Sequence, residues 1–384
     1  MRELFLLDPE LTFLNHGSYG ACPREVLHAQ QQWQQAMERN PVEFLGRRSA
    51  GLLAAARARW AAELNAPADD IAFVANATTG VNVVARSLEL QPGDEVLATD
   101  HEYGACVEAW KLICRERGAT FRTVTIPLPF ERERFVERLL AAAGPRTRVV
   151  YASHITSTTA LVLPVAELCA AARGRGLVSV IDGAHAPGHV ALDLAAIGAD
   201  FYTGNGHKWL CGPKGAAFLY VGPEHQRRIA APVISWGYAA EVSGHTGFDA
   251  YTGRTALERR LLWQGTRDVA AWLALPVAID FQARHDWPAV RARCHALLAD
   301  TLHVWTRRFG LPPASTDDDY GQMAVLPVPH ADAERLRRRL WEESRIEVPV
   351  TQHAGRTFVR LSLQGYNTAA DVERLLAAPA LADY

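Results

Sequence analysis

The stretch RVVYASHITSTTALVLPVAELCAAARGRGLVSVID, residues 148–182, holds two short apolar runs on either side of an amphipathic segment. The runs at 148–152 and 177–181 predict buried strands, and residues 165–173 predict a helix between them. A strand, a helix and a second strand in this order form the unit of a parallel sheet. The same alternation predicts strands at 71–75, 95–98, 120–126 and 216–221, and helices at 79–88, 106–117 and 132–143. We therefore expect an α/β fold, with a mostly parallel sheet flanked by helices across roughly residues 65–225.

The regions outside this alternation differ in texture. Residues 1–20 look irregular, with a turn at 15–20, and helices are expected at 24–37 and 44–64. Past Trp263 we expect helical structure over 269–308, a strand at 323–328, a helix at 331–344, strands near 346–350 and 357–363, and a helix from 369. This pattern indicates a smaller α+β unit. The predicted division is an N-terminal segment near the active site (1–20), a large α/β domain (21–265) and a small C-terminal α+β domain (266–384).

Composition excludes several classes of protein. The chain has 384 residues, 49% of them hydrophobic and 21% charged, and a net charge of −2. These values are typical of soluble globular chains and give no basic excess for nucleic acid. No apolar run approaches the roughly 18–20 residues of a membrane span, and the N-terminus lacks the layout of a signal peptide, so a cytoplasmic location is expected. The six cysteines show neither CxxC nor zinc-ligand spacing, and Pro187-Gly188 separates His185 from His189, so no metal is expected.

Polar residues follow the predicted strands, where ligands of open α/β sheets bind. Asn76-Ala77-Thr78-Thr79-Gly80 opens a helix, and it reads either as an anion site or as an ordinary cap by Thr78 or Thr79. Asp182 ends a wholly apolar strand, where it is either a functional carboxylate or a turn residue. Lys208, in the small-residue segment TGNGHKW (203–209), is either a desolvated nucleophile or a surface group.

The three features together favour the functional interpretation. Pyridoxal phosphate needs a Schiff-base lysine, a carboxylate for its pyridinium nitrogen and a cradle for its phosphate. Lys208, Asp182 and the turn at 76–80 provide one of each. The sequence therefore predicts pyridoxal phosphate as the cofactor.

The chain resembles the class V aminotransferase superfamily, the fold type I enzymes that use pyridoxal phosphate, and within it the isopenicillin N epimerase-like group. The motifs that carry this resemblance are LNHGSYGACP (14–23), NATTGVN (76–82), DHEYGA (100–105), SHITSTTALVLPV (153–165), GHKW (206–209) and WQGTRDVAAWLALPVAIDF (263–281). The resemblance covers nearly the whole chain. It implies a sheet of the seven-stranded type and a homodimer with active sites at the subunit interface.

The resemblance also implies roles for individual residues. Lys208 would bind the cofactor covalently, and Asp182 would pair with the pyridinium nitrogen. The cofactor's phosphate would lie against Thr78, Thr79, Asn205 and His207, with Gly265 and Thr266 reaching it from the neighbouring subunit. Arg360, in FVRLSLQGYNT, would bind the substrate α-carboxylate. Asn15, His16 and Arg267 would line the substrate pocket.

Three departures from the related cysteine desulfurases stand out. His154 and His185 occupy positions beside the ring's 3′-oxygen where those enzymes have Asn and Gln. Tyr103 replaces the histidine that stacks on the ring, and it still offers a π-face and a hydroxyl that can move a proton. Residues 346–356 contain no cysteine. Persulfide transfer by a thiol in this stretch is therefore not expected.

The reaction itself stays open at this point. An epimerase or racemase acting at Cα of an amino acid is favoured. Lys208 would remove the Cα proton from one face, and either Tyr103 or a pocket histidine would return a proton on the other. A C–S lyase working by β-elimination, like hercynylcysteine sulfoxide lyases or in relation to cysteine desulfurases, shares the first proton transfer, and so does a class V aminotransferase. A sensor module of a transcription factor is disfavoured, because no DNA-binding extension and no basic patch accompany the fold. The expected partner is a small amino-acid substrate, with no nucleic acid and no membrane.

Overall fold

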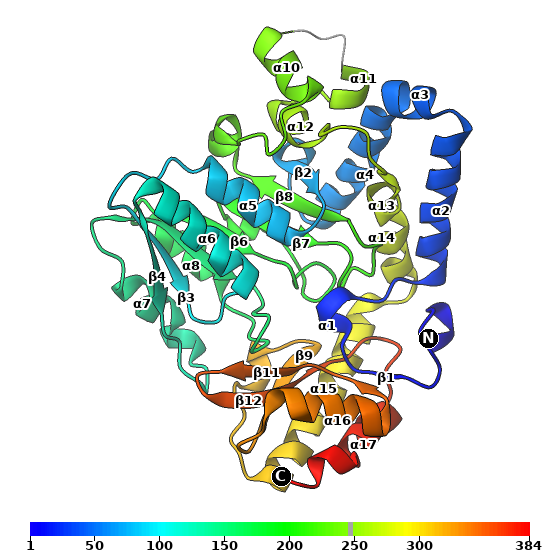
Figure 1. Ribbon diagram of the computed structural model, residues 1–384, viewed down its shortest axis with the longest axis vertical. Coiled ribbons are helices and arrows are strands. Elements are labelled where there is room, and N and C mark those ends of the chain that lie inside the picture. The colour runs from blue at the N-terminus through cyan, green and yellow to red at the C-terminus, as the bar shows by residue number, and fades with distance from the viewer. Residues whose placement is uncertain (245–248) are drawn as a thin grey trace.

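A seven-stranded sheet organises the larger part of the molecule (Figure 1). The structure, a computed structural model, describes residues 1–244 and 249–384. Across the sheet the strands are β2 (Ile71–Val74), β8 (Ala217–Val221), β7 (Phe201–Asn205), β6 (Val178–Asp182), β5 (Thr147–Ser153), β3 (Glu95–Thr99) and β4 (Thr120–Val124). Strand β8 runs antiparallel to both neighbours, and the other pairings are parallel. The predicted α/β fold with a mainly parallel sheet is confirmed.

One strand of this sheet is missing from the sequence prediction. No strand was predicted at β7, where Gly204 and Asn205 are poor strand formers. Pairing with β6 on one side and β8 on the other overrides that weak local preference, and all five of its residues are buried. Gly80 allows the neighbouring helix to approach β7, since a Cβ there would lie 2.2 Å from Thr203 Oγ1.

Helices bury both faces of the large sheet. One face packs against α5 (Ala77–Ser87), α6 (Gly104–Arg117) and α12 (Ala256–Leu261). The other packs against α4 (Ser49–Glu63), α7 (Arg132–Ala141), α8 (Val165–Arg173), α13 (Ala270–Leu273) and α14 (Leu275–Arg284). Successive strand residues divide between the two cores, as in β2, where Ala72 and Val74 face one and Ile71 and Phe73 the other. Helices therefore shield both faces of the sheet from water, and the strands are continuous apolar runs for this reason.

A second, antiparallel sheet forms the smaller part of the molecule. Its strands are β11 (Val350–His353), β12 (Arg356–Ser362) and β9 (Met323–Val328), in that order. The helices that pack with it in one core include α15 (Trp287–Phe309), α16 (Ala333–Ser344) and α17 (Ala369–Leu376). The helical stretch expected at 269–308 is interrupted before α15, where Asp286 adopts φ +46° and caps that helix through Ala289 N. The domain boundary at residue 265 stays a prediction, and both α13 and α14 contact α2 (Arg24–Arg39) and α4.

The N-terminal segment lies between the two parts (Figure 1). After a short 3₁₀ turn (Arg2–Leu4), strand β1 (Thr12–Phe13) pairs in parallel with β10 (Ile346–Glu347). Asn15 then bridges to Ser362, and α1 (His16–Tyr19) turns toward the large sheet. Gly20 follows with φ +70°, and a Cβ there would lie 2.1 Å from His207 O. The segment is thus held against β12 on one side and against the loop after β7 on the other.

Four further short helices complete the α-helices of the described chain. They are α3 (Pro41–Glu43), which runs through a π-helical turn (Phe44–Arg48) into α4, α9 (Leu194–Ile197), α10 (Trp236–Ser243) and α11 (Asp249–Thr252). Among the helices of the described chain, none combines the length and the apolar character needed to traverse a lipid bilayer.

Candidate active site

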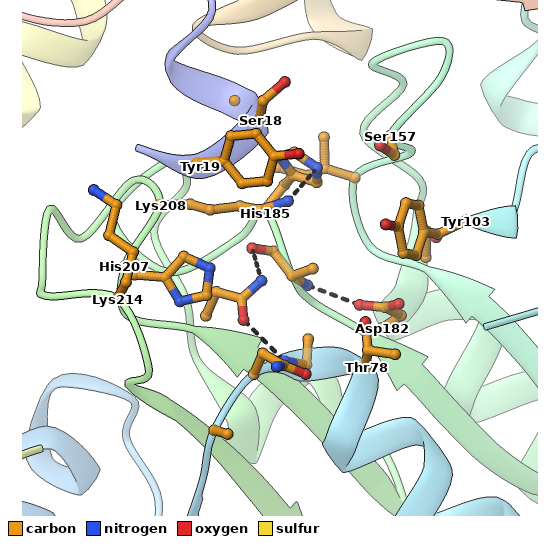
Figure 2. Close-up of a pocket in the computed structure, with 18 of the residues that line it drawn as sticks. Ser18, Tyr19, Thr78, Tyr103, Ser157, Asp182, His185, His207, Lys208 and Lys214 are labelled. Atoms are coloured by element: carbon orange, nitrogen blue, oxygen red, sulfur yellow. Dashed lines mark hydrogen bonds between the residues drawn. The ribbon is translucent and has the colours of Figure 1, made fainter. Parts of the chain in front are cut away.

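A cavity of about 490 Å³ opens where the strands of the large sheet end (Figure 2). Its walls come from α1, from the segments that follow β2, β3, β5, β6 and β7, and from β12 of the smaller sheet. The parallel strands place these segments together, because their carboxyl ends share one edge of the sheet. The cavity therefore collects residues that are more than 300 positions apart, such as Ser18 and Arg360.

Lys208 projects into this cavity from the loop after β7, and Tyr19 lines the same cavity (Figure 2). Its Nζ lies 3.1 Å from Nε2 of His185. Burial lowers the pKa of Lys208 to about 7, and the positive charge of Arg360 acts in the same direction while Asp182 opposes it. The amine is consequently available in its neutral, nucleophilic form near neutral pH.

Asp182 is the last residue of β6, and its side chain borders the cavity although the residue is only 3% exposed. Oδ1 accepts a hydrogen bond from Ala184 N at 3.0 Å. Oδ2 accepts one from the hydroxyl of Tyr151 at 3.2 Å and a weaker one from Cys106 Sγ at 3.6 Å. Burial raises the pKa of Asp182. A cationic N–H group placed in the cavity would offset this cost by pairing with the carboxylate.

The N-terminus of α5 provides the anion-binding part of the cavity. Its cap is Asn76, whose Oδ1 accepts from Thr79 N at 2.8 Å, so the alternative of a cap by Thr78 or Thr79 is wrong. Thr78 lines the cavity, whereas the hydroxyl of Thr79 donates to Asn76 Oδ1. Asn205 fixes the same turn by accepting from Ala77 N at 2.9 Å. The N–H groups of Ala77 and Thr79 are thus already bonded, and it is the helix dipole that favours an anion at this point.

Two basic side chains face the same end of the cavity. His207 and Lys214 both line it (Figure 2), and Nδ1 of His207 is buried without a hydrogen-bond partner in the described part of the chain. Lys214 Nζ donates to Gly20 O at 2.9 Å. A helix N-terminus and an ammonium group are suitable partners for a phosphate, and the His207 ring lies beside them. The residues present therefore fit the phosphate of the expected cofactor.

Arg360 lies on β12 at the opposite wall and is only 5% exposed. Nη1 donates to Ser157 O at 2.5 Å, and Nη2 donates to Ser18 Oγ at 3.0 Å and to Asn15 Oδ1 at 3.4 Å. Among residues 1–244 and 249–384, its Nε has no hydrogen-bond partner and no carboxylate forms an ion pair with it. Burial lowers the pKa of Arg360 to about 10. A buried guanidinium without a counter-ion is a site for an anionic ligand.

Tyr103 stands at the cavity mouth, on the side of Asp182 and across from His207 and Lys214 (Figure 2). It is the N-cap residue of α6 and is 45% exposed. The preceding residue, Glu102, is buried and accepts hydrogen bonds from Ser153 N at 2.8 Å and Ser153 Oγ at 2.6 Å. Burial raises the pKa of Glu102 to about 7. Glu102 thus links the ends of β3 and β5 at the position that precedes Tyr103.

Seven of the residues expected at the site are not part of the cavity wall that the described residues form. Thr79 bonds to Asn76 through its hydroxyl, and Asn15 accepts a hydrogen bond from Arg360. His16 lies behind the lysine loop, where Nε2 contacts Lys208 O at 2.9 Å. His154 contacts the Tyr202 hydroxyl at 2.7 Å through Nδ1. Arg267 lies 4.5 Å over the ring of Trp272 and bonds to Leu262 O, so it holds the loop between α12 and α13. Gly265 and Thr266 lie in that loop.

Sequence reasoning missed several residues of the cavity wall, among them Ser18, Tyr19, Ser157 and Lys214. Ser18 and Tyr19 come from α1, and Ser157 comes from the segment after β5. Tyr19 is 74% exposed, and no local pattern in LNHGSYG distinguishes it from a surface residue. Lys214 belongs to GPKG (212–215), to which sequence reasoning assigned no role. Its short separation from Lys208 along the chain is the signal that could have placed it near the site.

Comparison with known proteins agrees with this geometry. A model of the aminotransferase class-V family matches residues 14–375. Isopenicillin N epimerase of Streptomyces clavuligerus is 39% identical over 98% of this chain and 96% of its own. A putative L-cysteine desulfhydrase of Oryza sativa subsp. japonica is 30% identical over 94% and 81%. Among solved structures, a mutant of C-DES with glycine covalently linked to its PLP cofactor superposes with a TM-score of 0.82, at 24% identity and 99% coverage of both chains.

Proposed function

The chain belongs to the aminotransferase class-V family, and from this premise we propose that it binds pyridoxal phosphate through Lys208 and acts at Cα of an amino acid. The observation that carries the proposal is the buried Arg360, which has no carboxylate partner among the described residues and shares a cavity with a lysine of lowered pKa. The α-carboxylate of an amino acid would pair with this guanidinium, because the planar guanidinium can donate two parallel hydrogen bonds to the two carboxylate oxygens.

The cofactor has a fitting residue for each of its parts. Asp182 would hold the ring nitrogen, the N-terminus of α5 with Thr78, Asn205 and His207 would hold the phosphate, and Lys208 would hold the aldehyde carbon. When bound, pyridoxal phosphate supplies an electron sink that stabilises negative charge at the substrate Cα. The chain's own residues must then orient the substrate and move its proton.

For the reaction we favour epimerisation. Lys208 would take the Cα proton from one face, since its amine is neutral near pH 7. Tyr103 projects into the cavity from another element and would return a proton to the opposite face. The likeness to isopenicillin N epimerase over nearly the full length supports this choice.

A C–S lyase is the second candidate, because the chain is also 30% identical to a putative L-cysteine desulfhydrase. The proton transfer to Lys208 would be the same. Tyr103 would then protonate the departing sulfur instead of Cα. No cysteine stands in residues 346–356 to take up that sulfur, so the thiol would leave the enzyme.

We further propose a homodimer in which Gly265 and Thr266 of one subunit approach the phosphate of the other. Two observations support it. Both residues lie outside the cavity of their own chain as far as the described residues define it. The region between β8 and α12 exposes large apolar side chains, among them Val233 at 46%, Ile234 at 66% and Val242 at 70%.

The deciding experiment is an incubation in deuterium oxide. The purified enzyme is mixed with single enantiomers of amino acids and with cysteine S-conjugates, and the products are followed by NMR. Deuterium at Cα together with the opposite enantiomer would support the epimerase. Pyruvate, ammonia and a free thiol would support the lyase and overturn the epimerase. Lys208→Ala is the control and should show neither.

A further inference from the structure

Trp209 follows Lys208 directly, and its indole is completely buried. The indole ring lies against two histidines, with ring centroids 4.0 Å from His189 and 5.0 Å from His16. Its Nε1 donates a hydrogen bond to Nδ1 of His185 at 3.2 Å. The other ring nitrogen of His185, Nε2, lies 3.1 Å from Nζ of Lys208. A chain of hydrogen bonds therefore runs from the indole, through one imidazole, to the amine.

The direction of this chain follows from what each group is able to donate. An indole nitrogen is a donor only, so Nδ1 of His185 must accept and carries no proton. A neutral imidazole has a single proton, which then resides on Nε2 and faces Lys208. Nε2 is thus the donor, and the amine nitrogen must accept through its lone pair. An ammonium group has no lone pair, so this arrangement admits only the neutral amine.

The tautomers of His189 and His16, which pack against the indole, follow from their hydrogen-bond partners in the same way. The backbone N–H of Gln322 donates to Nε2 of His189 at 2.7 Å, which leaves the proton of that ring on Nδ1. Nε2 of His16 lies 2.9 Å from the carbonyl oxygen of Lys208 and must donate to it. Burial lowers the pKa of both rings to about 3. Neither ring has a free tautomer, so the indole is held in one orientation by neutral groups.

We propose that Trp209 is a positioning residue: its N–H occupies Nδ1 of His185, keeps the ring proton on Nε2, and so holds Lys208 in the neutral form that attacks the cofactor. The groups that act electrostatically on His185 are Lys208, Arg360, His189 and His207, all basic. None of them supplies an acceptor that would draw the proton to Nδ1. The indole N–H is therefore the group in the described structure that selects the tautomer.

Loss of the indole N–H has a defined consequence. In Trp209→Phe the aromatic ring still packs between the histidines, but Nδ1 of His185 is free to carry the proton. Nε2 then becomes an acceptor, and a protonated Lys208 donates to it. The charged lysine gains a hydrogen bond, so the pKa of Lys208 rises by about one pH unit, the size of one net hydrogen bond.

The first test reads the tautomer itself. Histidine side chains labelled with ¹⁵N are observed by NMR in the full-length protein, and the signal of His185 is identified by its loss in His185→Gln. The wild-type protein should show a protonated Nε2 and an unprotonated Nδ1, and Trp209→Phe should show a proton on Nδ1. A wild-type ring protonated on Nδ1 would overturn the proposal, and so would an unchanged tautomer in the variant.

The second test reads the lysine and rests on the proposed function. The rate at which pyridoxal phosphate binds is measured against pH by visible absorbance, and the midpoint should rise by about one unit in Trp209→Phe. In the His185→Gln background the same substitution should cause no further shift, because the tautomer no longer exists. Trp305→Phe, another buried indole whose N–H bonds to Pro327 O at 2.8 Å, is the matched control and should leave the midpoint unchanged.

Failure of the two proposals is distinguishable. If Lys208→Ala still acquires the visible absorbance, the assignment of the lysine is wrong, while the NMR measurement still decides the tautomer. If Lys208 binds the cofactor and Trp209→Phe shifts the midpoint equally with and without His185, Trp209 acts by packing alone and its role through His185 is refuted.

Discussion

At Lys208, burial and the positive charge of Arg360 both disfavour the ammonium form, and Asp182 only partly compensates. The ordinary pKa of 10.5 is lowered to about 7, so the neutral fraction grows as the pH rises through 7 and is nearly complete at about pH 8. The rate of pyridoxal phosphate binding by the cofactor-free protein should therefore rise with pH and level off near pH 8. Stopped-flow absorbance measures it. A rate that keeps rising to about pH 10 would contradict the lowered pKa.

Removing the positive charge of Arg360 also tests whether the pKa of Lys208 is lowered. Arg360→Gln deletes a cation that disfavours protonation of Lys208. The midpoint of the rate profile should move to higher pH, toward the ordinary lysine value. Arg356→Gln, on the same strand but outside the described cavity wall, serves as the control and should leave the midpoint in place.

Arg360 also tests the nature of the substrate. Arg360→Lys keeps a positive charge but loses the planar fork that binds a carboxylate in two places. KM for the amino acid should rise roughly 10- to 100-fold, the effect of losing one charge-assisted hydrogen bond. Steady-state kinetics measure this change, and the absorbance of bound cofactor should persist. An unaltered KM would remove Arg360 from the substrate site.

At the scale of elements, two substitutions of the α5 cap residue, Asn76, distinguish its contribution to stability from its effect on anion binding. Asn76→Ala loses the hydrogen bond to Thr79 N, and the free energy of unfolding should fall by about 1 kcal/mol in denaturant titrations. Asn76→Asp keeps a cap but places a negative charge beside the phosphate site, so stability should hold while affinity for pyridoxal phosphate falls. Asp332→Ala removes the cap of α16 and should cost stability alone. Tight cofactor binding by Asn76→Asp would place the phosphate elsewhere.

The elements that could be predicted from the sequence are those with a strong local pattern. Strands β2, β3, β5, β6 and β8 lie where apolar runs placed them, and α8 matches its predicted bounds. Strand β7 could not be found, since its identity depends on two neighbours that pair with it. The break before α15 depends on one residue, Asp286, in a conformation that periodicity does not reveal.

The same distinction applies to the site. Asp182 was found because it ends a predicted strand, Lys208 because it stands in the small-residue segment 203–209, and Arg360 because of its motif. Tyr19 and Ser157 reach the cavity only because the chain folds back from distant segments. His16 was expected to line the cavity, and it contacts the backbone of Lys208 instead. Motif membership indicates the neighbourhood of a residue, but packing decides which way its side chain points.

At the scale of the whole molecule, the proposed dimer makes each site dependent on two chains. Lys208→Ala lacks the cofactor lysine, and Thr266→Asp would repel the phosphate of its partner. Each variant alone should be inactive or nearly so. Mixed and refolded together in equal amounts, they should regain about a quarter of the wild-type activity, since half the dimers are hybrids with one intact site each. Activity that never exceeds the sum of the separate variants would place Thr266 outside the neighbouring site.

The N-terminal segment gives this enzyme an order of assembly. Thr12 and Phe13 pair with Ile346 and Glu347, and Asn15 forms a bridge with Ser362. Strand β1 therefore gains its partners only after most of the chain has been synthesised. During synthesis that interval is on the order of tens of seconds. A chain interrupted before β12 lacks Arg360 and leaves Ser18 and Tyr19 undocked. A complete substrate pocket therefore forms only once translation has passed β12, which ends at residue 362.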